Sequence, residues 1–303
     1  MKVHFSNVNF SSSSGPNSFG GRLAQELALR NYKIVDKDDD YDIFLCFIEP
    51  ASVPAQKARF IHRLDGIWFK PAQFKTHNVN IKSAYNKCDH VIWQSNFDKN
   101  MTEKWWGKRI GSVIPNGIEI KSIVHNDPTL KRIRASYDKV FVSSSSWHRQ
   151  KRLKENIELF LLLKKRYKNA CLIVMGNPDH VVSHPDVIYV GHIPHDICLQ
   201  IYSIADWMIH LAWLDHCPNV VVEAISQKCS VICTDSGGTH EIVKDNGIII
   251  NETSPYKFEL TDYDKPYEIK LQEIDLPDLN IENDYLNIKV AADAYEKVFK
   301  GEK

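Results

Sequence analysis

The sequence carries no net charge, because its 38 lysines and arginines match its 38 aspartates and glutamates. A balanced chain has no general attraction to nucleic acid, and we expect no nucleic-acid partner. No apolar run reaches the roughly 18 residues that a membrane-spanning helix needs. Residues 1–10 alternate polar and apolar side chains instead of forming the continuous apolar stretch of a signal peptide. These absences argue against a nucleic-acid-binding, membrane-spanning or secreted protein.

Disulfide frameworks and metal-binding cysteine pairs are also missing. The seven cysteines are an odd number without paired metal spacing, and several lie in apolar runs such as 230–233. We expect reduced, buried thiols and a cytoplasmic location. The acidic run 36–42 and the scattered histidines are assigned to solvated turns, so no metal site is predicted; these histidines are His180, His184, His192 and His195.

What the sequence does contain is enough apolar material for two compact domains. A chain of 303 residues exceeds the usual size of one small domain. Its 43% apolar and 25% charged residues are typical of globular proteins. We found no internal repeat of fixed period.

Short apolar strands alternate with helical patterns through both halves of the chain. In the first half, the pattern predicts strands near residues 3–10, 32–35, 41–48, 61–64, 91–94 and 112–114, a serine- and glycine-rich loop at 11–21, and helices at 22–30, 81–88 and 99–106. In the second half, it predicts strands at 139–143, 171–175, 187–189, 207–210 and 231–234, and helices at 153–166, 195–204 and 220–227. A polar connector, 121–137, separates the halves, and a helix is expected at 285–299.

This alternation predicts an α/β protein with two doubly wound, Rossmann-like domains built on parallel sheets. The predicted domains are residues 1–118 and 119–284, followed by a helix at 285–303 that packs back toward the amino-terminal domain. Ligands of such folds bind at the carboxyl ends of the strands, and a cleft between the domains is the expected site.

The residues best suited to ligand binding or catalysis lie between 215 and 241. Pro218 and Asn219 suit the start of a helix, which puts Asp215 in the loop before it and Glu223 one turn inside. Carboxylates placed there can bind sugar hydroxyls, and free amides at a helix start favour phosphate. Gly237 and Gly238 allow close backbone approach, and Thr239 is predicted to cap a helix that holds Glu241. For each acid taken alone, interaction with the helix dipole is the favoured explanation.

Taken together, these residues resemble a known family. Asp215, seven intervening residues, Glu223-Ala, then Gly237-Gly238 and Glu241-Ile-Val resemble the signature of family 4 glycosyltransferases of the GT-B fold. The resemblance extends to Ile173-Val-Met-Gly176, Val190-Gly191, the segment 201–206 and Ile114-Pro-Asn-Gly-Ile118, and it covers most of residues 85–245. It implies retaining transfer of a sugar from a UDP- or GDP-linked donor, with no metal and no cofactor.

The resemblance also implies roles for individual residues. Glu223 would hold the ribose and Asp215 would face the transferred sugar, although the family usually has glutamate at that first position. Gly237, Gly238, Thr239, Glu241 and Asn116 would lie on the donor. Basic residues would neutralise the diphosphate. Lys151 is the best match and Arg149 the next, and Arg152 could equally take the role. Surface charges at a helix start are the competing interpretation of these three.

In the first half, Gly20 and Gly21 resemble the family's acceptor-side glycine pair, expected near the donor phosphates. His62 lies where the family often carries a histidine at a strand end, which makes it a candidate catalytic residue. His62, Arg63 and Asp65 are candidates for contact with the acceptor or the donor sugar. For each of these three, a simple turn after a strand explains the residue nearly as well.

The predicted function is therefore a retaining, metal-independent glycosyltransferase acting on a carbohydrate or lipid-linked acceptor. An epimerase-like or non-catalytic sugar-nucleotide-binding protein of the same fold is the alternative. Between Lys57 and Arg109 there are 11 basic residues and 4 acidic ones. An ordinary solvated face is the favoured interpretation of this excess, and an anionic acceptor or a weak peripheral membrane contact is the alternative.

Overall fold

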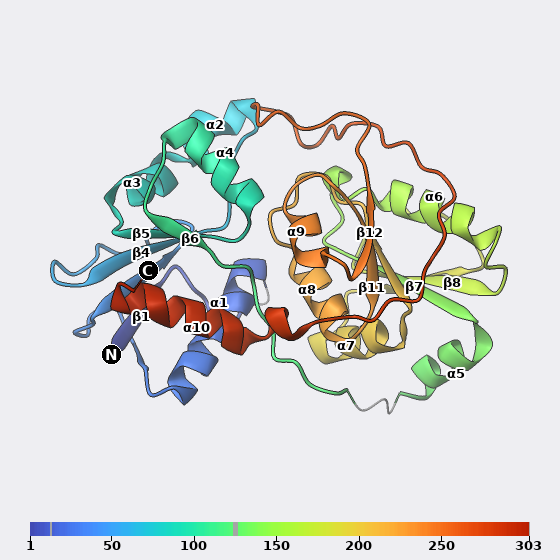
Figure 1. Ribbon diagram of the computed structural model, residues 1–303, viewed down its shortest axis with the longest axis horizontal. Helices are drawn as coiled ribbons and strands as arrows, with labels where there is room; N and C mark the ends of the chain where they lie inside the picture. Colours follow the sequence, from blue (N-terminus) through green and yellow to red (C-terminus); the bar gives the residue numbers. More distant parts are fainter. Residues whose placement is uncertain (13, 124–126, 303) are drawn as a thin grey trace. The chain divides into compact units, whose positions relative to one another are not determined.

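The chain folds into two compact units, each built on a six-stranded parallel sheet with helices (Figure 1). The computed structural model describes residues 1–12, 14–123 and 127–302. Unit 1 comprises Met1–Glu119, Lys257–Asp262 and Asp284–Lys303, and unit 2 comprises Ile120–Tyr256 and Tyr263–Asn283. The predicted α/β class with two doubly wound halves is confirmed.

The sheet of unit 1 has the strand order β2-β1-β3-β4-β5-β6. Its strands are β1 Lys2–Ser6, β2 Lys33–Val35, β3 Ile43–Phe47, β4 Arg59–Leu64, β5 His90–Trp93 and β6 Gly111–Val113. Its helices are α1 Gly15–Leu29, α2 Pro71–His77, α3 Val79–Lys87, α4 Asn96–Trp106 and α10 Ile288–Lys300, and the short 3-10 helix η2 is Asp284–Leu286.

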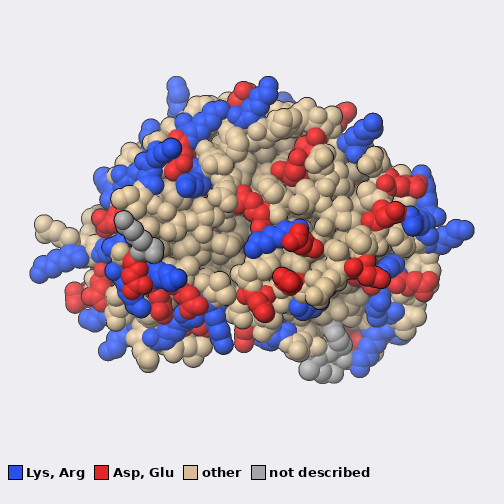
Figure 2. Space-filling view, viewed as in Figure 1, with Lys and Arg blue, Asp and Glu red and all other residues tan. Residues whose placement is uncertain are grey.

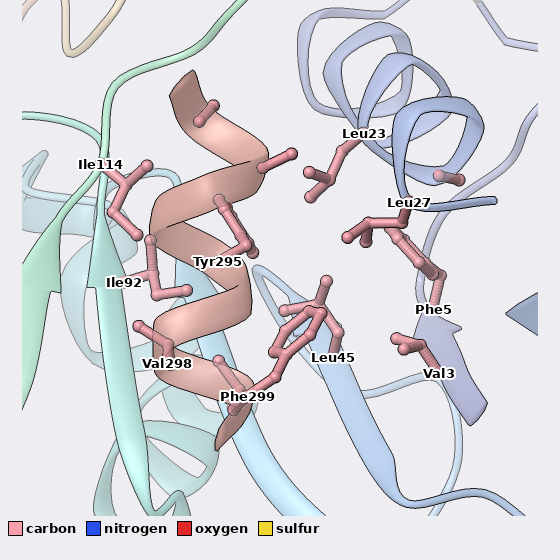
Figure 3. Close-up of a cluster of buried hydrophobic side chains, with 14 of the residues drawn as sticks. Val3, Phe5, Leu23, Leu27, Leu45, Ile92, Ile114, Tyr295, Val298 and Phe299 are labelled. Atoms are coloured by element: carbon pink, nitrogen blue, oxygen red, sulfur yellow. The ribbon is translucent and has the colours of Figure 1, made fainter. Parts of the chain in front are cut away.

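The last helix, α10, completes the core of unit 1. Its apolar residues recur at helical spacing, so that Ala292, Tyr295 and Phe299 pack among side chains of β1, β3 and α1 (Figure 3). Asn287 caps the helix by accepting a hydrogen bond from the amide of Lys289 at 3.1 Å. A Cβ on Gly117 would lie 2.9 Å from the Cα of Ile288, so this junction needs a glycine. The predicted return of the terminal helix to the amino-terminal domain is confirmed.

The sheet of unit 2 has the strand order β12-β11-β10-β7-β8-β9. Its strands are β7 Lys139–Ser144, β8 Ala170–Met175, β9 Val187–Gly191, β10 Trp207–His210, β11 Ser230–Thr234 and β12 Gly247–Ile250. Its helices are α5 Pro128–Ser136, α6 Leu153–Lys164, α7 His195–Ile204, α8 Asn219–Ser226 and α9 Thr239–Val243, and the 3-10 helix η1 is Arg149–Lys151.

The strand order of unit 2 fixes where a ligand is expected. The chain runs outward from β7 through β8 to β9 and then returns to the other side of β7 with β10. Ligands of open parallel sheets bind outside the carboxyl ends of the strands at this reversal. The loops that follow β7 and β10 are therefore the first place to look for a site.

Two helices and one strand were not predicted, and two boundaries were wrong. Helix α2 and strand β12 are too short to give a clear periodic signal, and α5 lies in the segment 121–137 that was expected to be a polar connector. Strand β1 ends at Ser6 rather than near residue 10. Helix α1 begins at Gly15 rather than near residue 22, with Pro16 in its first turn, so Gly20 and Gly21 lie within a helix and not in a loop. A Cβ on Gly20 would come within 2.8 Å of Val8, which explains one glycine by close packing.

Candidate functional site

An ion pair joins the loops that follow β7 and β10. After β7 the chain turns through Ser145–His148 into η1, and the ammonium of Lys151 donates a hydrogen bond to Oδ2 of Asp215. Asp215 lies in the loop between β10 and α8, as its sequence position predicts. The Nε2 atom of His210, the last residue of β10, lies 3.5 Å from the same carboxylate oxygen. A cation, an acid and an imidazole thus meet at the strand-order reversal of unit 2.

The environment of this cluster keeps Asp215 ionised. Burial raises the pKa of Asp215, but the Lys151 ammonium and His210 more than offset it and hold the pKa well below its usual range. Burial lowers the pKa of His210 despite the nearby carboxylate, and burial also lowers the pKa of His216 to about 4. Both imidazoles are therefore neutral at pH 7, and the fixed charges of the cluster are one cation and one anion.

Glu223 lies on α8, the helix that the Pro-Asn start predicts. The helix begins at Asn219 with Pro218 at its N-cap, and the carboxylate of Glu223 is only 10% exposed. Nε2 of His195, at the start of α7, lies 3.1 Å from Oε1 of Glu223, and the His195 side chain is 57% exposed. Glu223 is thus an acid near a helix start with an exposed, displaceable imidazole beside it.

Gly237 and Gly238 bring the loop after β11 against the backbone of Asp215. The amide of Gly238 donates a hydrogen bond of 2.7 Å to the carbonyl of Asp215. Gly237 has a φ of +71°, and a Cβ there would lie 2.4 Å from the same carbonyl oxygen. The close backbone approach that two glycines allow is used here to fix the Asp215 loop.

The predicted helix cap at Thr239 is wrong. Helix α9 has Gly238 at its N-cap and Thr239 as its first helical residue. The side chain of Thr239 is buried, and its hydroxyl has no hydrogen-bond partner within residues 1–12, 14–123 and 127–302. Glu241 lies in the first turn of α9 and is half-buried.

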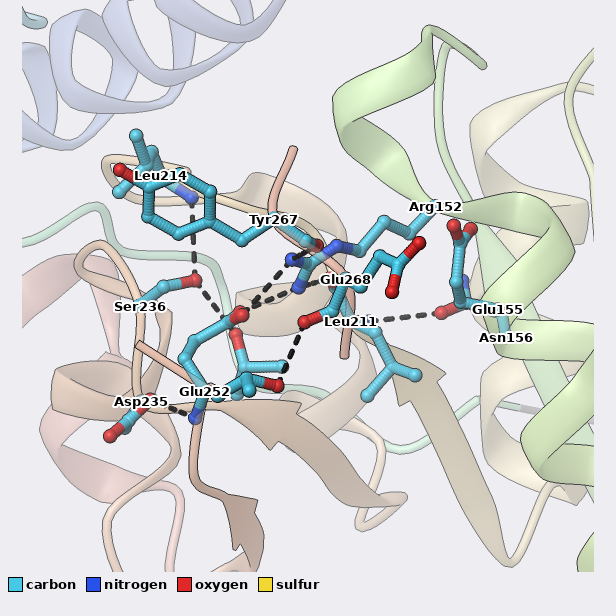
Figure 4. Close-up of polar contacts among 12 residues, drawn as sticks. Arg152, Glu155, Asn156, Leu211, Leu214, Asp235, Ser236, Glu252, Tyr267 and Glu268 are labelled. Carbon is cyan, nitrogen blue, oxygen red and sulfur yellow. Dashed lines mark hydrogen bonds and ion pairs between the residues drawn. The ribbon is translucent and has the colours of Figure 1, made fainter. Parts of the chain in front are cut away.

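Arg152 is held entirely by protein groups. It has a left-handed backbone conformation at the start of α6, and its side chain is fully buried. Its guanidinium makes two hydrogen bonds to Glu252, of 2.5 and 3.0 Å, and a third of 2.6 Å to the carbonyl of Tyr267 (Figure 4). Glu252 is 2% exposed. Arg152 would have to leave these partners in order to bind a diphosphate.

Arg149 points to solvent. Its side chain is 54% exposed, and its guanidinium donates a hydrogen bond of 2.9 Å to Glu155. Of the three basic candidates at 149, 151 and 152, Lys151 is the one that the structure brings to Asp215.

The candidates of unit 1 form a separate buried group at the end of β4. Nε2 of His62 donates a hydrogen bond of 2.6 Å to the carbonyl of Ile48, and burial lowers the pKa of His62 to about 4. Arg63 pairs with Asp65 and donates a hydrogen bond of 2.5 Å to Asn116. The Arg63 guanidinium also lies over two aromatic rings, with centroids 4.5 Å away in Phe19 and 4.7 Å away in Phe47. His62, Arg63, Asp65 and Asn116 therefore have demonstrable structural partners, and contacts with a ligand remain predictions.

Sequence reasoning missed His210 and Glu252. His210 closes a strand that was predicted correctly, and a polar residue at the carboxyl end of a parallel strand is itself a signal. Glu252 stands 100 residues from its partner Arg152, and no local pattern connects them.

The described part of the chain has neither a metal-binding cluster nor a membrane-spanning helix. Residues 1–12, 14–123 and 127–302 contain no group of three or more His, Cys, Asp or Glu side chains placed to hold a metal ion. In the same residues, no helix is both long and apolar enough to cross a membrane. The seven cysteines all lie within these ranges and form no disulfide, and six of them are buried.

The segment that contains the Lys151 and Asp215 cluster matches a known family. Residues 129–259 match the family model of the glycosyl transferases group 1. The match extends from α5 past β12 and includes Glu223 and both glycines of the β11 loop. No curated protein sequence matches this chain.

Three solved structures share the fold over most or nearly all of the chain. Sucrose-phosphate synthase from Thermosynechococcus elongatus has a TM-score of 0.66 at 14% identity, with 84% of this chain and 86% of that one covered. The Anabaena protein HepE in complex with UDP-glucose has a TM-score of 0.59 at 16% identity, with 83% and 85% covered. AviGT4, a glycosyltransferase involved in avilamycin A biosynthesis, has a TM-score of 0.61 at 12% identity, with 99% and 97% covered. These likenesses confirm the predicted GT-B class, with its two Rossmann-like domains.

Proposed function

We propose that this protein is a retaining glycosyltransferase that moves a sugar from a nucleotide-linked donor to a carbohydrate or lipid-linked acceptor. The observation that supports it most is the Lys151 and Asp215 pair at the strand-order reversal of unit 2, inside the segment that matches group 1 glycosyl transferases. The pair lies where a parallel sheet binds ligands, and it supplies the cation that a diphosphate needs.

The donor would bind on unit 2. Glu223 would accept hydrogen bonds from the ribose hydroxyls. The exposed imidazole of His195, whose Nε2 lies 3.1 Å from the carboxylate, would then either move away or stay beside the ribose. Lys151 would contact the diphosphate while keeping Asp215, because an ammonium has three donors and one of them is engaged with that carboxylate. Asp215 would face the transferred sugar.

The transfer itself would be driven by stabilisation of the leaving nucleotide. The bond between the anomeric carbon and the phosphate oxygen breaks, and negative charge grows on the diphosphate next to Lys151. The acceptor hydroxyl attacks from the same face and gives its proton to the departing phosphate oxygen. A cation already fixed by Asp215 stabilises that charge without reorganisation, so it favours the transition state more than the bound donor. The proposal requires no metal ion and no cofactor.

Donor binding can be tested by thermal unfolding in the presence of UDP-, GDP- and ADP-sugars. A ligand at a hundred times its dissociation constant stabilises the folded state by about 2.7 kcal/mol. We expect one base to raise the melting temperature, with the shift lost in Glu223→Gln and kept in Glu158→Gln, an exposed acid on α6 of the same unit. If no nucleotide raises the melting temperature of the wild-type protein, the proposal fails.

Turnover separates transfer from mere binding. With the donor so identified, Lys151→Met should lower kcat by about 10²–10³-fold with a smaller effect on KM, as the loss of one transition-state contact does. Lys154→Met, which removes a 70% exposed lysine three residues on, is the matched control. Activity should persist with EDTA, and the product should keep the anomeric configuration of the donor. Donor binding without transfer to any acceptor, or epimerisation of the donor sugar alone, would favour the alternative functions.

A further inference from the structure

One stretch of unit 1 has an unbalanced charge that the proposed reaction does not use. Residues 66–88 contain four lysines and neither aspartate nor glutamate, in a chain whose total charge is balanced. Helices α2 and α3 occupy most of this stretch, separated by the single residue Asn78.

Lysines and apolar side chains share the exposed face of these helices. On α3, Val79 is 61% exposed, and Lys82 and Lys87 lie on either side of it around the helix axis, while Ile81, Ala84 and Tyr85 are buried. Lys75, four residues before Val79, is exposed on α2. Trp68 is 40% exposed, and its ring lies 5.2 Å from that of His77 at the end of α2. We call Trp68, Lys75, Val79, Lys82 and Lys87 the basic face of unit 1.

The lysines of the basic face are not neutralised within the protein. Lys70, just before α2, pairs with Asp262 at 3.1 Å. By contrast, Lys75, Lys82 and Lys87 form no ion pair with any acid of the described ranges 1–12, 14–123 and 127–302. Lys104 and Lys108 are also exposed at and beyond the end of α4, and Figure 2 shows basic side chains gathered over α2 and α4. An exposed field of one sign is suited to a partner of the opposite sign.

We propose that the basic face of unit 1 docks on a lipid bilayer that contains anionic lipids. Charge alone would also suit a nucleic acid, but Trp68 and Val79 are exposed apolar side chains of the same stretch, and the backbone of Trp68 is hydrogen-bonded to the side chain of Asn78, the residue before Val79. Tryptophan is favoured at the boundary between head groups and acyl chains, and lysine stems can lie along that boundary while their ammonium groups reach the phosphates. Apolar insertion and charge attraction together provide the two signals that reversible membrane binding requires. The proposal does not depend on the proposed transfer reaction.

Sedimentation of the full chain with lipid vesicles tests the docking. We expect binding to vesicles that mix phosphatidylcholine with phosphatidylserine, no binding to phosphatidylcholine alone, and weakening by salt. The variant Lys75→Gln/Lys82→Gln/Lys87→Gln should lower the partition coefficient by about 10²-fold, given the contribution of each lysine near an anionic surface. The matched control Lys33→Gln/Lys37→Gln/Lys297→Gln removes three exposed lysines of the same unit and should bind as wild type does.

Insertion of the aromatic residue provides a second measurement. Brominated anionic lipids should quench part of the tryptophan fluorescence, and Trp68→Phe should remove that part. Equal melting temperatures of the variants and the wild type establish that they are folded. Three results would each overturn the proposal. The triple α2–α3 variant could bind anionic vesicles as tightly as the wild type does, or the wild type could bind neutral vesicles as well as anionic ones. The wild type could also bind duplex DNA but not vesicles.

Discussion

The buried pair of Arg152 and Glu252 should dominate the stability of unit 2, and replacing one partner should show it. In Arg152→Met, the carboxylate of Glu252, 2% exposed, loses both of its hydrogen bonds to the guanidinium. A buried charge left without its partner costs about 3–5 kcal/mol. Glu252→Leu removes the counter-charge of the guanidinium, but the carbonyls of Tyr267 and Leu211 still accept hydrogen bonds from it at 2.6 and 3.3 Å. That variant should therefore be somewhat less destabilised.

The double variant distinguishes the ion pair from ordinary packing. Arg152→Met/Glu252→Leu leaves no buried charge at this site, so its loss of stability should fall short of the sum of the single losses by about 1–3 kcal/mol. Urea unfolding followed by circular dichroism gives these free energies, and hydrogen exchange should locate the weakening in unit 2. Single losses that add within about 0.5 kcal/mol would refute the reasoning, because uncoupled residues behave in that way.

Three further variants test other parts of the structure. Because the pKa of Asp215 is lowered in the folded state, its ionised carboxylate stabilises the fold at neutral pH, and this contribution is lost as the pH falls below the unfolded pKa of about 3.9. Asp215→Asn should therefore lower the urea midpoint at pH 7 and reduce the fall of that midpoint below about pH 5. A fall with pH as steep as that of the wild type would contradict this. Gly237→Ala should lower the free energy of unfolding by at least about 2 kcal/mol, because Gly237 has a φ of +71° and a Cβ there would meet the Asp215 carbonyl. A melting temperature equal to that of the wild type would count against that geometry. Gly21→Ala should raise the free energy of unfolding by about 0.5–1 kcal/mol, since Gly21 lies inside α1 with no atom within 4 Å of the added Cβ. A lower melting temperature would argue against open space there.

The sequence predicts the fold well because the alternation of strands and helices is a local signal. Strands β7 and β10 and helices α6, α7 and α8 agree with the predicted ranges within a few residues. Strand β12 was missed because Gly247 and three isoleucines make too short a pattern. Helix α1 was placed too late because two glycines favour a loop locally, whereas close packing against Val8 explains Gly20 in the folded chain.

The candidate site was harder to resolve from sequence than the fold. Three basic residues within four positions are chemically similar, and the sequence does not show which one faces Asp215. The left-handed turn at Arg152 sends its side chain to Glu252, while Lys151 reaches Asp215 from η1. Both partners are distant in the chain, at separations of 100 and 64 residues, so tertiary folding decides the outcome.

The path of α10 also determines the order in which the protein can be completed during synthesis. Tyr295 and Phe299 pack in the core of unit 1 beside Val3 and Leu45, yet nearly all of unit 2 is translated between them. Domains fold as units while the chain emerges, and unit 2 has its own core. Unit 2 can therefore fold on the ribosome, whereas the first hundred residues wait with an apolar face uncovered until the last helix is released. A chain that stops before α10 leaves that face open to aggregation, even though every residue of the Lys151 and Asp215 cluster has been made.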